Sequence, residues 1–208
     1  MRLKPLHLPD SGPLLGAGYL LLWLLLWPTV QPFWMLPYGL RFGALLLVPV
    51  RHWGWLLGAE FAASAGLALA HGLPTGWAGF AVDELPEPLV MAGGLWLLRR
   101  FNLHASLHSP QEVTRLLLSV VLMVTATTAV DAALFALVRV PDSPELMLRV
   151  LGEELLSHYL GILLIVPLMI MLLRTRLEQG ALASLIMDGL LVMLPSMTIL
   201  LVLSEQAA

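Results

Sequence analysis

Residues 14–27, with the sequence LLGAGYLLLWLLLW, decide the class of this protein because they hold no charge and no alternation of apolar and polar side chains. Residues 116–124 (LLLSVVLMV) and 161–173 (GILLIVPLMIMLL) have the same character. A membrane β-strand alternates apolar and polar residues, whereas a helix satisfies its own backbone hydrogen bonds in lipid. These blocks therefore predict membrane-spanning helices.

The composition of the whole chain agrees with this interpretation. Of its 208 residues 59% are hydrophobic and 12% are charged, against about 25% charged in an average soluble protein. The mean hydropathy is +0.86. One globular core cannot hide this apolar excess, so we predict an all-α polytopic membrane protein with membrane lipid as its main partner. The absence of cysteine excludes disulfides, and a net charge of −3 argues against nucleic-acid binding.

The apolar pattern predicts a bundle of about seven transmembrane helices in a single domain, residues 1–208. Arg2 and Lys4 precede the first apolar stretch, but no cleavage site follows it, so we interpret the stretch as an uncleaved anchor. Residues 71–84 are rich in Gly and Pro and are predicted to form a loop. The predicted spans are residues 14–30, 35–50, 53–70, 87–101, 113–138, 146–173 and 183–203.

The fourth span is the weakest, because its uncharged run, residues 89–98, is shorter than the roughly 20 residues that cross a bilayer. The distribution of Lys and Arg supports it, since cytoplasmic segments carry an excess of these residues. With seven spans and a cytoplasmic N-terminus, eight cationic residues lie inside and two outside. Without the fourth span the two sides carry five each. We therefore predict that it spans, with Glu84 and Glu87 at the outer interface.

Polar residues inside the spans are costly in lipid and face the bundle interior or a water-filled cavity. Helical spacing puts several of them on common faces at similar depths in the outer half of the membrane. We expect one outward-facing polar cavity in which Arg41 pairs with Asp131 or Glu154. The predicted ligand-binding residues are Trp34, Tyr38, Arg41, His71, Glu84, Glu87, Asp131, Glu154, His158 and Tyr159.

Other interpretations of these residues stay open. They could hold helices together as buried polar contacts, and for Glu60 with Ser64 this explanation is as good as a functional one. The spacing Glu154-x-x-x-His158 suits a metal, but no HExxH motif or histidine cluster accompanies it. No G-x-S-x-G motif is present, so we predict no catalytic residue and no cofactor in this segment. A small membrane transporter would use the same buried charges as a substrate or proton path.

Several motifs resemble the first class of MASE domains, which are membrane-associated sensor domains of bacterial signalling proteins. The similar stretches are residues 33–45 (FWMLPYGLRFGAL), 51–53 (RHW), 58–61 (GAEF), 97–101 (LLRRF) and 159–168 (YLGILLIVPL). The resemblance covers about residues 33–173. The chain departs from the family pattern at His158, where an aspartate is usual, and at Glu84 and Glu87, where an asparagine is expected.

The resemblance implies about eight helices, placed N-terminal to a histidine kinase or diguanylate cyclase domain. It therefore implies a fragment of a longer two-component receptor in the bacterial inner membrane, lacking one helix and the cytoplasmic output domain. Some related kinases are taken to respond to plant cytokinins, so a flat, purine-like small molecule is one candidate ligand. A homodimer is expected, because kinases of this kind act in pairs.

Overall fold

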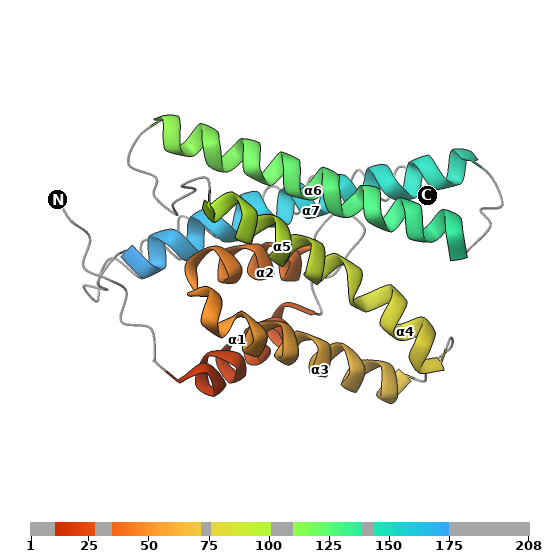
Figure 1. The fold of residues 1–208 in the computed structure, drawn as a ribbon, viewed down its shortest axis with the longest axis horizontal. Helices are drawn as coiled ribbons and strands as arrows, with labels where there is room; N and C mark the ends of the chain where they lie inside the picture. Colours follow the sequence, from red (N-terminus) through yellow and green to blue (C-terminus); the bar gives the residue numbers. More distant parts are fainter. Residues whose placement is uncertain (1–10, 28–34, 72–75, 101–109, 139–143, 175–208) are drawn as a thin grey trace, which may run out of the picture. The chain divides into compact units, whose positions relative to one another are not determined.

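The computed structural model describes residues 11–27, 35–71, 76–100, 110–138 and 144–174, and all regular structure in these ranges is helical. The chain divides into two compact units, Met1–Val166 and Pro167–Ala208. The second unit contributes only the last turns of α7 to the described residues. The helices in Figure 1 are α1 (Gly12–Leu26), α2 (Leu36–Leu47), α3 (Trp53–His71), α4 (Gly76–Glu84), α5 (Pro86–Arg100), α6 (Pro110–Val138) and α7 (Pro144–Arg174), with a short 3₁₀ turn η2 (Val50–His52) before α3.

The prediction of an all-helical protein is confirmed for the described residues, and a described helix overlaps six of the seven segments predicted as spans. The seventh, residues 183–203, lies outside the described residues. Apolar segments long enough to cross a membrane occur in two described helices, Gln111–Leu134 in α6 and Met147–Ile170 in α7. Many large apolar side chains are exposed on the helices, among them Leu21, Leu25, Leu118, Leu122 and Leu148. Lipid-facing surfaces have this character, whereas soluble monomers rarely expose large apolar patches.

The prediction of a loop over residues 71–84 is wrong, because α4 occupies most of it. Gly76 begins this helix with φ of 69°, a conformation that favours glycine. Pro86 and Pro88 have no N–H to donate to the carbonyl groups one turn earlier, so the helix breaks at Leu85 and resumes as α5. Figure 1 shows α4 leading directly into α5. The fourth predicted span is therefore preceded by more helix rather than by a loop.

Helix α2 lies at the centre of the first unit, because every residue from Leu36 to Leu46 is buried. It approaches α7 at two glycines that touch backbone to backbone. A Cβ atom on Gly39 would overlap the carbonyl group of Gly161, and one on Gly161 would overlap the carbonyl group of Met35. Only glycine allows this contact, which lets the neighbouring residues Tyr38 and His158 meet.

Candidate functional site

A buried arginine on α2 is the centre of the polar cluster. Arg41 is 9% exposed, and its Nε donates to Oε1 of Glu60 on α3 at 2.8 Å. Its Nη2 donates to the same oxygen, and its Nη1 lies 2.9 Å from Oε1 of Glu87 on α5. A buried guanidinium must be paired to be tolerated. Two carboxylates from two different helices supply this pairing.

Helix α1 joins the cluster through the carboxylate of Glu60, which is 3% exposed. The hydroxyl of Tyr19 donates to Oε2 at 2.8 Å, and the indole Nε1 of Trp23 donates to Oε1 at 3.2 Å. Both oxygens of Glu60 therefore have donors, and the donors come from α1 and α2. This part of the cluster is fully satisfied, so it resembles a rigid structural core.

One turn before Arg41, on the same face of α2, Tyr38 forms an aromatic pair with His158 of α7. The rings of Tyr38 and His158 stack with centroids 3.8 Å apart and planes 5° apart. The hydroxyl oxygens of Tyr38 and Thr127 are 2.6 Å apart. Thr127 donates to a main-chain carbonyl one turn earlier on α6, which makes Tyr38 the donor in their contact. Nε2 of His158 lies 3.7 Å from Oε1 of Glu87, so the pair reaches the Arg41 cluster.

The structure brings together four of the predicted residues, Tyr38, Arg41, Glu87 and His158. Asp131 and Glu154 lie close enough to interact electrostatically with each other and with Glu87. The prediction that Arg41 pairs with Asp131 or Glu154 is wrong, since its partners are the glutamates of α3 and α5. Periodicity gave the face of each helix but not which helices meet.

The remaining predicted residues are placed differently. Trp34 and the side chain of His71 lie outside the described residues. Tyr159 is half-buried and follows His158 directly, so it lies on another face of α7. Glu84 lines a small cavity instead of contacting Arg41. The prediction that these four residues bind a ligand therefore stays a prediction.

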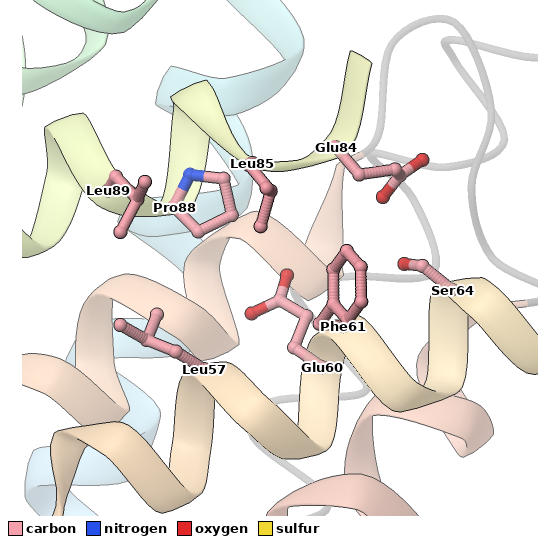
Figure 2. Close-up of a pocket in the computed structure, with 8 residues that line it drawn as sticks. All are labelled: Leu57, Glu60, Phe61, Ser64, Glu84, Leu85, Pro88 and Leu89. Carbon is pink, nitrogen blue, oxygen red and sulfur yellow. The ribbon is translucent and has the colours of Figure 1, made fainter. Parts of the chain in front are cut away.

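The cavity lies between α3 and the α4–α5 break and has a volume of about 40 Å³. Figure 2 shows the side chains of Glu84 and Ser64 directed toward one another across it. The space holds a water molecule or the polar head of a ligand, whereas typical ligand pockets are about 300–1,000 Å³. Its lining residues are Leu57, Glu60, Phe61, Ser64, Glu84, Leu85, Pro88 and Leu89.

Several buried polar atoms in the cluster have no hydrogen-bond partner. Near α6 and α7 these are Thr128 Oγ1, Asp131 Oδ2 and His158 Nδ1. Nη1 of Arg41 and Oε1 of Glu87 form an ion pair that is not aligned as a hydrogen bond. Buried polar groups in native proteins are nearly always bonded, so each exception requires an explanation. Within the described ranges, no group of three or more His, Asp or Glu side chains is arranged to hold a metal ion.

The sequence reasoning missed Tyr19 and Trp23 as members of the cluster and undervalued Glu60. A signal for the first two was present, because they are one turn apart on an otherwise apolar helix and share a face. For Glu60, the signal was a charged residue on the face of α3 that also carries Ser64. These signals identify polar faces, and only the packing of the helices shows that the faces converge on Arg41.

A protein-family model, MASE1, matches residues 12–208. The match confirms the resemblance indicated by the motifs and extends it to both sides of them. No curated protein and no solved structure matches the chain.

Proposed function

This chain belongs to the MASE1 family of membrane-associated sensor domains, and on that premise we propose that it is the input domain of a bacterial two-component histidine kinase. In this proposal it crosses the inner membrane several times, acts as a dimer and responds to a small molecule at the Arg41 cluster. One observation carries the proposal: a buried guanidinium is shared between Glu60 of α3 and Glu87 of α5.

Such an arrangement suits a sensor because each partner belongs to a different helix. A ligand transmits a signal only if it binds one arrangement of the helices more tightly than another. A polar ligand that competes for Arg41, Glu87 or His158 changes the contacts among α2, α5 and α7 at once. The satisfied contacts of Glu60 with α1 and α2 would keep the rest of the cluster in place.

The cavity beside Glu60 supports a route for a ligand toward this cluster. It is bounded by the α4–α5 break, where the prolines remove helical hydrogen bonds and make the segment easier to move. A flat, purine-like ligand such as a cytokinin would have to widen it, because the observed volume is about 40 Å³. Widening would separate α3 from α5, the two helices that Arg41 links.

The test is the melting temperature of the detergent-purified chain against a panel of small polar and aromatic ligands, cytokinins included. We expect a saturable rise with one ligand, because binding to the folded state alone stabilises it. Glu87→Gln removes the charge of this side chain but keeps its size, and it should abolish the ligand-induced rise in melting temperature. Arg41→Ala should abolish the rise as well. Glu153→Gln is the matched control, since Glu153 pairs with Arg149 on the exposed side of α7.

The opposite result would be equally informative. If no ligand of the panel shifts the melting temperature of the chain, the cluster is structural and the proposal of a ligand-sensing site fails. Substrate flux across proteoliposomes that contain the purified chain would instead support the transporter alternative.

A further inference from the structure

Two exposed arginines lie where α5 ends and α6 begins. Arg100 is the last residue of α5, and Arg115 lies in the second turn of α6. Neither forms an ion pair with a carboxylate in the part of the chain that the structure describes. Glu112, one turn before Arg115, is half-buried and has an interaction of its own. The charges of both arginines are therefore directed outward, toward whatever surrounds the helices.

The packing of α5 against α6 brings the two arginines to the same level. The helices are in contact and run in opposite directions (Figure 1). They meet at Gly94, where a Cβ atom would overlap the sulfur of Met123. From this contact Arg100 lies six residues along α5 and Arg115 eight residues back along α6, which is about 9 Å and about 12 Å in the same direction. Two long side chains at nearly equal depth on neighbouring helices can reach one anion.

The indole of Trp96 indicates which depth this is. Cζ of Arg100 lies 4.2 Å from the centroid of the Trp96 ring, and Trp96 is 43% exposed. Exposed tryptophans of membrane proteins are enriched at the level of the lipid headgroups. A guanidinium over an indole face keeps the N–H groups at its edge for other acceptors. The stacking therefore holds Arg100 at headgroup depth with its donors directed outward.

The surface next to the arginines is apolar. On α5, Leu97 lies one turn before Arg100, and on α6, Leu118 and Leu122 follow Arg115 at helical spacing on the same face. All three leucines are exposed. From the arginines toward the middle of both helices, the surface thus changes from cationic to apolar. A phospholipid presents its phosphate and its acyl chains in the same order.

We propose that the outer surface of α5 and α6 binds an anionic phospholipid. Arg100 and Arg115 donate to oxygens of its phosphate, and its acyl chains lie along Leu97, Leu118 and Leu122. Arginine is suited to this role because its planar fork of N–H groups matches the oxygens of a phosphate. The site is separate from the Arg41 cluster, so it stands or falls independently of the ligand proposed there.

Other occupants use only part of this surface. A free phosphate or phosphate ester engages the arginines but leaves the leucines without a partner. A zwitterionic lipid covers the leucines, but its own cationic group lies close to its phosphate and offsets the attraction to the arginines. Basic groups beside a membrane-spanning helix favour anionic over zwitterionic headgroups for this reason. The experiment therefore compares headgroup charge and acyl chains separately.

Three probes are added to the detergent-purified chain at constant pH and ionic strength: phosphatidylglycerol, phosphatidylcholine and glycerol 3-phosphate. We expect phosphatidylglycerol alone to raise the melting temperature in a saturable way, because a ligand of the folded state stabilises it. Arg100→Gln and Arg115→Gln should each weaken the apparent affinity for this lipid about fivefold, the share of one cation beside an anionic headgroup. The matched control is Arg149→Gln, an exposed arginine near the start of α7, which should leave the affinity unchanged.

A second measurement needs no arginine variant. Phosphatidylglycerol with brominated acyl chains should quench the tryptophan fluorescence of the chain more than brominated phosphatidylcholine does. This excess quenching should disappear in Trp96→Phe, because Trp96 lies beside the site.

Four results would overturn the proposal. Absence of a shift with phosphatidylglycerol, or an equal shift with phosphatidylcholine, would show that an anionic headgroup is not recognised. An equal shift with glycerol 3-phosphate would identify a site for free anions that does not require acyl chains. A phosphatidylglycerol shift that persists unchanged in both arginine variants, or excess quenching that persists in Trp96→Phe, would place the lipid elsewhere on the protein.

Discussion

Two arginines hold α2, and they do so in opposite ways. Arg41, in the middle of the helix, pairs with side-chain carboxylates of α3 and α5. Arg99, at the end of α5, donates from Nη2 to three main-chain carbonyl groups where α2 ends, those of Leu45, Leu46 and Val48, at 2.7–2.9 Å. The acceptors of Arg99 are fixed by the backbone, whereas those of Arg41 are side chains that a ligand can draw away.

The comparison separates a structural cation from a responsive one. The last carbonyl groups of a helix lack intrahelical donors and carry partial negative charge, so a cation there stabilises the fold without a charged partner. Arg99 is further held against the ring of Trp53, 5.0 Å from its centroid. At Arg41, by contrast, removal of the guanidinium leaves two carboxylates, Glu60 and Glu87, without their cation. The two sites should therefore differ both in stability and in ligand response.

The largest effect is expected for Arg41→Ala. The substitution leaves Glu60 and Glu87 as buried carboxylates without their cation, which costs about 3–5 kcal/mol of stability. Thermal unfolding in detergent should show a large fall in melting temperature, or no folded protein. Arg149→Ala is the control, because its side chain is 70% exposed in a surface pair and its removal should cost less than about 1 kcal/mol. Equal effects of the two variants would show that the Arg41 cluster is not a buried charge site.

A somewhat smaller effect is expected for Gly161→Ala. The added methyl group overlaps the carbonyl group of Met35, so α2 and α7 must separate at a cost of about 3 kcal/mol. The separation also pulls His158 away from Tyr38, so ligand response should weaken while the Arg99 contacts persist. Gly152→Ala, on the same helix with open space around it, should be neutral or slightly stabilising. If Gly161→Ala is as well tolerated as Gly152→Ala, the close crossing of α2 and α7 is wrong.

The next largest effect is expected for Arg99→Ala, which tests the contacts at the C-terminal end of α2. It removes the hydrogen bonds of Nη2 to the carbonyl groups at the end of α2, and their combined loss should lower stability by about 2 kcal/mol. Arg100→Ala is the matched control, since it removes only a contact with Trp96 at 4.2 Å, worth about 0.5 kcal/mol. The apparent ligand affinity should not change in either variant. A lost ligand response in Arg99→Ala would contradict the division into structural and responsive cations.

The same two arginines show how far sequence reasoning reaches. The apolar blocks and the motifs predicted the helical class and the family, and the polar residues of α2 and α7 were predicted to face the bundle interior, while Glu87 of α5 was placed at the outer interface. The partners of Arg41 could not be predicted, because periodicity assigns a residue to a face of its own helix and does not say which helices pack together. The carbonyl acceptors of Arg99 carry no sequence signal at all, since every residue has one.

Local signals failed at the connection after α3 for a different reason. Gly and Pro between residues 71 and 84 are typical of a loop, yet Gly76 begins α4. The prolines that do interrupt the helix are Pro86, directly before the predicted fourth span, and Pro88, inside it. Glycine occurs both in loops and at the start of helices, so its presence in the sequence does not distinguish the two. Only the backbone conformation does.

The smallest effect is expected for Tyr38→Phe, which tests whether charge or the hydroxyl link dominates around Arg41. The substitution removes the contact with Thr127 but keeps the ring against His158, and Thr127 still donates to a carbonyl group of α6. The substitution should therefore lower the free energy of unfolding by about 1 kcal/mol, which thermal unfolding would show as a small fall in melting temperature. The control is Tyr159→Phe, for which we expect no change. If Tyr38→Phe cost as much as Arg41→Ala, the hydroxyl link from α2 to α6 would hold this region together. The carboxylates around Arg41 would then have only a structural role, and Arg41 would no longer differ from Arg99 as a responsive cation differs from a structural one.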